Sequence, residues 1–343
     1  MNQKIVTTEN KRNQTLDVLK GISIFLVILT HFKWSDDQRL MFAFPFWIDM
    51  AIPIFIIITG YVNVLSYKKN NVNALREAYN PKILLSKFLR YTIPFIPIFF
   101  LEVFANIIFK QKQYNVLSVF KDFIQGGYGP GSYYYPFLLQ FIVLMPVAWF
   151  VISHFKEKGL IITFAINLFY EIFKNVMGMS DGLYRLIAIR HFFNLSLGCY
   201  IIYSKKMKKA YYYILTIIGF ASIILLNYSD YEPMFITKWK TTCMFATLFV
   251  FPTIKWLIDK NKLKNGLLEL MGKASYNIFL VQMFYFSIAS EMIYKQIFNP
   301  ILQMVINIVV CCGGGILFYY IETPATKSII NIVNKLGEKR QNN

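Results

Sequence analysis

The chain has 343 residues, of which 56% are hydrophobic and 16% are charged, and its formal net charge is +18. Soluble domains carry about 25% charged residues, whereas here long apolar blocks alternate with short charged gaps, which excludes an ordinary soluble protein. The basic residues are spread over short loops and do not gather on one face, which argues against a nucleic-acid-binding protein. Such an excess is what the positive-inside rule produces in a membrane protein.

Long apolar segments run through the whole chain. A membrane-spanning helix needs about 20 mostly apolar residues. About ten segments meet this requirement: 17–34, 43–66, 84–109, 134–154, 159–176, 187–203, 211–228, 239–257, 274–293 and 299–321. We therefore predict an all-α, polytopic membrane bundle that forms a single domain over residues 1–343, with short tails at about 1–16 and 325–343.

The charges between these segments alternate along the chain. One set of loops is basic and includes Lys11, Lys68, Lys158, Lys208 and Lys262, whereas the other set is poorer in basic residues and includes Asp36, Asp181 and Asp230. The positive-inside rule then places both termini in the cytoplasm, and an even number of spans requires the same. We expect a multi-pass protein of the cell membrane, and the abundance of Asn, Lys and Ile is compatible with a bacterial source. The longest outer loop, 110–133, is rich in glycine and is predicted to be irregular or re-entrant.

Three polar residues, Asp17, Lys20 and His31, lie in the first apolar segment. Charged groups inside a bilayer cost about 2.5–3.5 kcal/mol on insertion scales, and they are functional candidates for that reason. Lys20 and His31 are eleven positions apart, which places them on one helix face about 16 Å apart along the axis. Asp17 is close enough to Lys20 to pair with it.

This spacing suits an extended ligand with a phosphate head and a reactive tip. The phosphopantetheine arm of acyl-CoA has about that reach, with Lys20 near the cytoplasmic surface and His31 deeper in the membrane. The alternative is that Lys20 extends to the membrane surface and that His31 donates a structural hydrogen bond. The spacing alone leaves both interpretations open.

Further polar residues lie inside or at the borders of later segments, namely Asp49, Glu102, Gln140, Arg190 and His191. Because sugars need many hydrogen-bond partners, these residues are candidates for binding a sugar acceptor. Each would serve equally well to bridge helices. The four cysteines lie in apolar segments without metal-ligand spacing, so no metal site is expected.

The order of several short motifs resembles acyltransferase family 3, a family of membrane proteins. Its first helix carries a basic residue, ten intervening residues and a histidine, which Lys20 and His31 match. Later matches are Pro53–Tyr61, the basic pair Lys87 and Arg90, Tyr134–Gln140, the stretch L-E-L-M-G-K-A-S-Y-N-I-F-L-V-Q, and Glu322-Thr323-Pro324. Gln282 stands where the family usually has histidine, so no histidine role is transferred to it. The resemblance covers about residues 13–328.

The resemblance implies transfer of an acyl group, often acetyl, to sugars of surface polysaccharides. It implies acetyl-CoA or another acyl-CoA as co-substrate and no tightly bound cofactor, with Lys20, Lys87 and Arg90 neutralising the phosphates. His31 would act as a general base on a sugar hydroxyl, and a covalent acyl-histidine is the less favoured alternative. Asp17 would orient or balance Lys20. The expected partners are the glycan acceptor, membrane lipid, and a polysaccharide-synthesis complex or a second copy of the chain.

Two other classes of protein fit part of the pattern. A transporter or flippase of a lipid-linked glycan would also combine many spans with a central polar set, although the inverted repeats common in transporters are not visible. A structural partner in a polysaccharide-synthesis complex would not need His31, whereas an enzyme would.

Overall fold

The computed structural model describes residues 13–204, 208–229 and 244–339, and over these ranges the chain forms helices and connecting turns without a β-strand. The helices are α1 (Gln14–Thr30), α2 (Asp36–Met41), η1 (Phe44–Phe46), α3 (Ala51–Lys69), α4 (Leu75–Ala78), α5 (Pro81–Lys110), α6 (Val116–Ile124), α7 (Tyr134–Phe155), α8 (Glu157–Val176), α9 (Asp181–Leu186), η2 (Ala188–His191), α10 (Phe192–Tyr203), α11 (Lys209–Asn227), α12 (Met244–Lys260), α13 (Gly266–Lys273), α14 (Ser275–Met292) and α15 (Pro300–Lys339).

Each predicted apolar segment coincides with a helix. Within the described ranges, 6 helical stretches are long and apolar enough to cross a membrane: Phe44–Lys69, Leu75–Lys110, Tyr134–Phe155, Glu157–Val176, Lys209–Asn227 and Pro300–Leu336. The remaining predicted spans fall on α1, α10, α12 and α14, which are shorter or more polar. Residues 239–243 of one predicted span lie outside the described ranges. The all-α prediction is confirmed, whereas ten crossings and cytoplasmic termini stay predictions.

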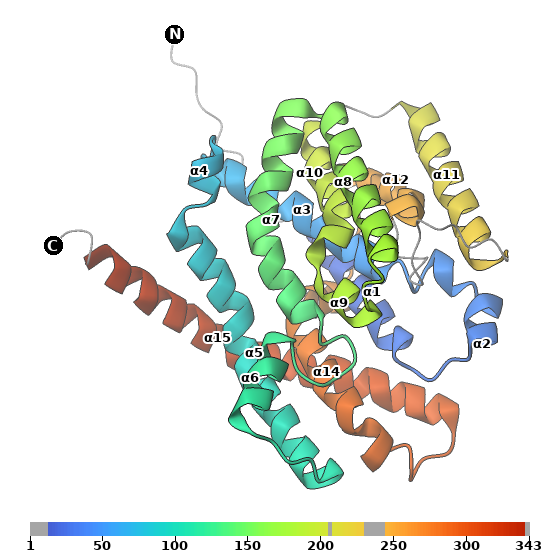
Figure 1. The fold of residues 1–343 in the computed structure, drawn as a ribbon, viewed down its shortest axis with the longest axis vertical. Helices are drawn as coiled ribbons and strands as arrows, with labels where there is room; N and C mark the ends of the chain where they lie inside the picture. The colour runs from blue at the N-terminus through green and yellow to red at the C-terminus, as the bar shows by residue number, and fades with distance from the viewer. Residues whose placement is uncertain (1–12, 205–207, 230–243, 340–343) are drawn as a thin grey trace.

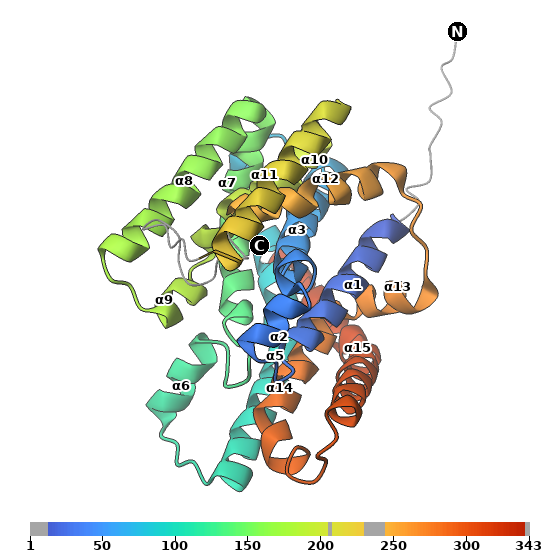
Figure 2. The same ribbon diagram turned by 90° about the vertical axis from the view of Figure 1, so that its right-hand side faces the viewer.

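The helices pack in two groups, with α1 between them (Figure 1, Figure 2). One group contains α3, α7, α8, α10, α11 and α12, and the other contains α5, α14 and α15. α1 contacts α3 in the first group and α14 and α15 in the second. Its buried residues divide in the same way, because Leu16 and Leu19 pack with the first group while Ile24 and Ile28 pack with the second. The helix that carries Lys20 and His31 therefore lies at the centre of the molecule.

Two glycines allow α13 to pack closely against the first half of α1. A Cβ atom at Gly21 would collide with the backbone carbonyl of Leu268, and one at Gly272 would collide with the backbone carbonyl of Asp17. A larger residue at either position would force the two helices apart. This close contact holds the turn of α1 that carries Lys20.

The predicted outer loop 110–133 contains a helix and is not irregular throughout. α6 begins after Asn115, whose side chain accepts a hydrogen bond from the Ser118 N–H at 2.7 Å, and an N-cap of this kind stabilises a helix start. α6 packs on the core through Phe123, while the side chain of Phe120 is exposed. The glycine-rich part that follows is irregular as predicted, with positive φ angles in the segment 126–131.

The basic and glycine-rich loops lie at opposite ends of the molecule. Figure 1 shows α4 and the turn between α7 and α8 at the upper end, and α6 at the lower end. The predicted C-terminal tail is helical over residues 325–339, as the continuation of α15. Ser86 of α5 donates a hydrogen bond to the Asn334 side chain at 3.3 Å, which ties this end of α15 to the bundle.

Candidate active site

A cavity of about 530 Å³ lies between α1, α3, α5, α7 and α14, which is within the usual range of about 300–1,000 Å³ for small-molecule sites. Three connecting segments complete its wall: α2, the glycine-rich loop before α7, and the segment from α9 to η2. Tyr91, Tyr276 and Phe279 form an aromatic part of the wall. Tyr276 donates a hydrogen bond to the Tyr91 carbonyl at 2.8 Å, which fixes α14 against α5 at this point.

Lys20 and His31 both line this cavity, as the shared helix face predicted. Lys20 belongs to the middle of α1, and His31 is the residue at its C-terminal cap. Asp17 does not line the cavity and is buried at 4% exposure where α1 meets α13. The structure therefore brings Lys20 and His31 to one site and leaves Asp17 outside its wall.

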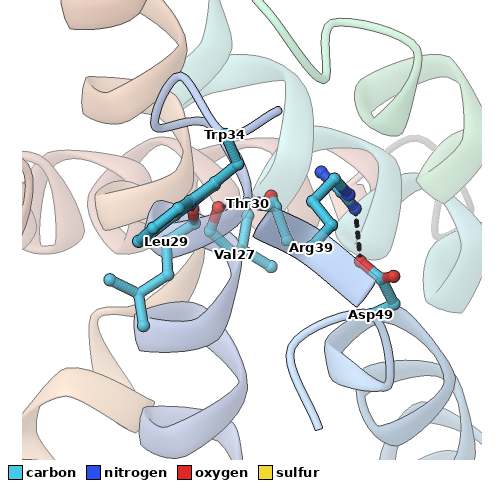
Figure 3. Close-up of polar contacts among 6 residues, drawn as sticks. All are labelled: Val27, Leu29, Thr30, Trp34, Arg39 and Asp49. Atoms are coloured by element: carbon cyan, nitrogen blue, oxygen red, sulfur yellow. Dashed lines mark hydrogen bonds and ion pairs between the residues drawn. The ribbon is translucent and has the colours of Figure 1, made fainter. Parts of the chain in front are cut away.

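The end of α1 is held by local hydrogen bonds. The last carbonyls of a helix lack intrahelical donors, and here the indole N–H of Trp34 donates to the Leu29 carbonyl at 2.9 Å. The backbone N–H of His31 donates to the Ile28 carbonyl at 3.2 Å. Figure 3 shows Trp34 lying against Leu29 at this helix end. These contacts fix the backbone from which the His31 side chain projects.

Gly131 lies beside the imidazole of His31. Its φ angle is +87°, and a Cβ atom there would lie 3.7 Å from Nε2 of His31 and 3.2 Å from the ring of Phe279. Positive φ angles favour glycine, and the missing side chain leaves bare backbone next to the imidazole of His31. Phe286 packs on the same imidazole, with ring centroids 5.7 Å apart.

Asp49 also lines the cavity, paired with an arginine that the sequence did not single out. The guanidinium of Arg39 on α2 lies 2.7 Å from Oδ1 of Asp49, and both residues line the cavity. Figure 3 shows Arg39 extended toward Asp49, which precedes α3. The pair connects α2 to the start of α3 at the cavity wall.

Glu102 does not line the cavity and holds one of the segments that do. Its carboxylate on α5 accepts hydrogen bonds from the N–H groups of Tyr128 and Gly129 at 3.0 and 3.1 Å. The side chain is fully buried, at 0% exposure. Pro130 and Gly131, which follow directly, line the cavity. We therefore assign Glu102 to positioning the loop and not to contact with a sugar.

Gln140 has a similar position on α7. Its Nε2 donates to the Leu186 carbonyl at 2.6 Å, and its Oε1 accepts from the Ala188 N–H at 3.0 Å. The amide therefore holds the main chain that leads to Arg190. Gln140 itself is not part of the cavity wall.

Arg190 and His191 are adjacent in sequence but have different surroundings. Arg190 lines the cavity, at 5% exposure. His191 is buried behind it, with Nδ1 3.2 Å from the Asn194 amide nitrogen and its ring against the edge of Phe137. Arg190 is thus placed to contact a ligand, and His191 belongs to the packing.

Lys87 and Arg90 lie outside the cavity wall. Lys87 donates a hydrogen bond to the Asn63 side chain at 2.7 Å, and its ammonium lies 4.9 Å from the ring centroid of Tyr67. Arg90 is exposed. The neighbouring Tyr91 lines the cavity, so the basic pair lies beside the site on α5 without forming its wall.

The sequence did not identify two further cavity residues, Arg39 and Arg185. Both belong to short helices in connecting segments. A single charged residue is common in such segments, so the sequence gives no indication that it belongs to a functional site. Tyr276 and Ser275 also line the cavity, and the S-Y pair inside the family-like motif was a usable signal. Gln282 of the same motif is fully buried, at 0% exposure, away from this wall.

Comparison of the chain with curated proteins and with solved structures gave no match. A family model does match: that of acyltransferase family 3, described as an acyltransferase domain, over residues 13–320. This range contains α1 with Lys20 and His31 and every other segment of the cavity wall. The chain belongs to acyltransferase family 3 and is a multi-pass membrane acyltransferase.

Proposed function

We propose that the protein transfers an acetyl or similar short acyl group from acyl-CoA to a sugar hydroxyl of a cell-surface polysaccharide or of its lipid-linked precursor. The observation that carries this proposal is the placement of Lys20 and His31, three turns apart on α1, in one cavity. Their separation along the helix, about 16 Å, matches the reach of a phosphopantetheine arm. Membership of an acyltransferase family supports the same reaction class.

In the proposed reaction His31 takes the proton of the acceptor hydroxyl as its oxygen attacks the thioester carbonyl carbon. The carbon–sulfur bond then breaks, and the CoA thiolate leaves and takes up the proton from the imidazolium. Lys20 neutralises a phosphate of the CoA as a charge-assisted partner. Lys87 and Arg90, beside the site on α5, add positive charge along the approach of the nucleotide.

The acceptor faces the aromatic and hydrogen-bonding part of the wall. Tyr133 and Tyr134 line the cavity next to Gly131, and aromatic rings with polar tips suit a sugar ring with its hydroxyls. The Arg39–Asp49 pair supplies further polar groups. The reacting hydroxyl would then lie between these residues and His31.

The test compares purified wild-type protein with His31→Ala and with His154→Ala, an exposed histidine outside the cavity. Each is incubated with radiolabelled acetyl-CoA and a glycan fraction from the source cell. We expect His31→Ala to lower labelling of glycan by about 10²–10⁴-fold, the usual contribution of a general base, and His154→Ala to label as wild type does.

Equal labelling by wild type and His31→Ala would remove His31 from the mechanism and leave an acyltransferase. No labelling by wild type, together with no binding of CoA, would favour a transporter of a lipid-linked glycan.

A further inference from the structure

The part of the cavity wall that α2, α9 and η2 form is strongly basic. Arg39 of α2, Arg185 of α9 and Arg190 of η2 all line it. They come from three separate segments, so helix geometry alone does not explain their convergence. Asp49 is the carboxylate among the wall residues within the described ranges, and it lies 2.7 Å from Arg39. The wall therefore carries more cations than this carboxylate balances.

Arg190 is the most buried of these cations, at 5% exposure. Its guanidinium lies over the ring of Tyr133, with the centroid 5.2 Å away, and over that of Tyr184 at 5.4 Å. Its Nε is buried without a hydrogen-bond partner among the described residues. A buried charge is costly unless it is paired and hydrogen-bonded, and ring faces offset only part of that cost.

Two carboxylates lie near the segment that carries Arg190. Glu171 accepts a hydrogen bond from the Tyr184 hydroxyl at 2.6 Å. Asp181 lies 3.3 Å from the Lys174 ammonium. Neither Glu171 nor Asp181 belongs to the cavity wall.

Arg190 is connected to the reacting centre through one short loop. Gly131 lies beside Nε2 of His31, and Tyr133, two residues further along, lies under the guanidinium of Arg190. The loop 131–133 therefore links the basic part of the cavity to the part of the wall that holds His31. Lys20 lies about three turns away along α1.

We propose that this part of the cavity binds an anionic group, a carboxylate or a phosphate, that a substrate of the transfer carries near the reacting atoms. The proposal rests on the proposed function and defines the chemistry of its substrates. Arginine guanidinium groups match such anions in a planar, bidentate manner. Two sources fit: an acidic sugar or phosphodiester of the acceptor glycan, or the free carboxylate of a dicarboxylic acyl group such as succinyl.

Two sets of ligands, one of CoA esters and one of sugars, distinguish these sources. Binding to the purified full-length protein is measured for acetyl-CoA against succinyl-CoA, and for methyl glucoside against methyl glucuronide and glucose 6-phosphate. We expect one anionic probe to bind at least about tenfold more tightly than its neutral counterpart, the effect of one charge-assisted contact. Preference for succinyl-CoA assigns the anion to the donor, and preference for an acidic sugar assigns it to the acceptor.

Variants locate the preference within the cavity. Arg190→Gln and Arg185→Gln should each reduce the difference in affinity between the anionic probe and its neutral counterpart to within about threefold. Arg190→Lys should keep part of this difference. Arg76→Gln, at an exposed position far from the cavity, should keep all of it. The Arg185 variant keeps the test decisive if Arg190→Gln does not fold.

Two results would overturn the anion site: no preference for any anionic probe in wild type, or a preference that survives in both glutamine variants. The proposed function would be contradicted by a different result: wild type that binds neither CoA ester and shows no transfer that depends on His31. That conclusion would hold for any result with the sugar probes.

Discussion

His31 is bordered by bare backbone and by an aromatic ring. Gly131 presents no side chain to its Nε2, while Phe286 packs on the imidazole. A substrate atom that approaches Nε2 therefore passes beside the main chain of Gly131. At the scale of single residues, a side chain at position 131 would crowd the His31 imidazole.

We predict that Gly131→Ala lowers the rate of acyl transfer at saturating acyl-CoA by at least about tenfold. The new methyl group lies 3.2 Å from the Phe279 ring, and misplacing a reacting group by about 1 Å can cost about 10²-fold. The backbone is also strained, because a side chain at this φ costs about 1–3 kcal/mol.

Gly178→Ala is the matched control, because Gly178 also has a positive φ, +59°, with nothing within 4 Å of the new Cβ. It carries the backbone strain without crowding at His31. If both variants lost the same activity, crowding at His31 would not be the cause.

At the scale of elements, the segments around the cavity are held by polar side chains of neighbouring helices that bind their main chain. Glu102 on α5 binds the loop before α7, and Gln140 on α7 binds the segment from α9 to η2. These hydrogen bonds fix the main chain of both segments to rigid helices.

Glu102→Gln tests this attachment. The amide keeps one acceptor oxygen and replaces the other with a donor that faces an N–H group, so one of the two hydrogen bonds is lost. A hydrogen bond to a charged group contributes about 1.5–3 kcal/mol. We expect faster proteolysis within residues 126–131 and a lower rate of transfer, with acyl-CoA affinity unchanged. An unchanged proteolysis rate would show that the carboxylate does not hold the loop.

The contact between α1 and α13 gives a prediction about stability. Gly272→Ala places a Cβ on the backbone carbonyl of Asp17, whereas Gly266→Ala on the same helix meets nothing within 4 Å. Overpacking costs about 1–3 kcal/mol, so we expect a lower unfolding temperature in detergent for Gly272→Ala and little change for Gly266→Ala. Equal unfolding temperatures would contradict the close contact.

The sequence predicted the helices far better than it predicted the site. Long apolar runs locate helices because the bilayer requires them. The placement of Lys20 and His31 on one helix face followed from helical spacing alone. Arg39 and Arg185 could not be predicted, since their place in the cavity depends on how short connecting helices fold back. Glu102 and Gln140 were recognised as unusual, but whether a buried polar group faces a ligand or a loop is decided by tertiary packing.

The orientation of the whole molecule is open to a direct test. Starting from a variant without its native cysteines, Lys158→Cys at the α7–α8 turn and Lys121→Cys on α6 place thiols at exposed positions at opposite ends. The distribution of basic loops predicts that a membrane-impermeant maleimide labels Lys121→Cys in intact cells, and labels Lys158→Cys only after permeabilisation. The reverse pattern would place the termini outside.

The two main-chain attachments have a consequence for how the protein can evolve. Glu102 and Gln140 bind backbone groups, and therefore they hold their segments whatever side chains those segments carry. The side chains of Tyr133, Arg185 and Arg190 are left to face the cavity. The residues that hold the main chain are thus different from the residues whose side chains face the cavity. A lineage can exchange the recognising side chains and acquire a new acceptor while the scaffold that presents them stays the same.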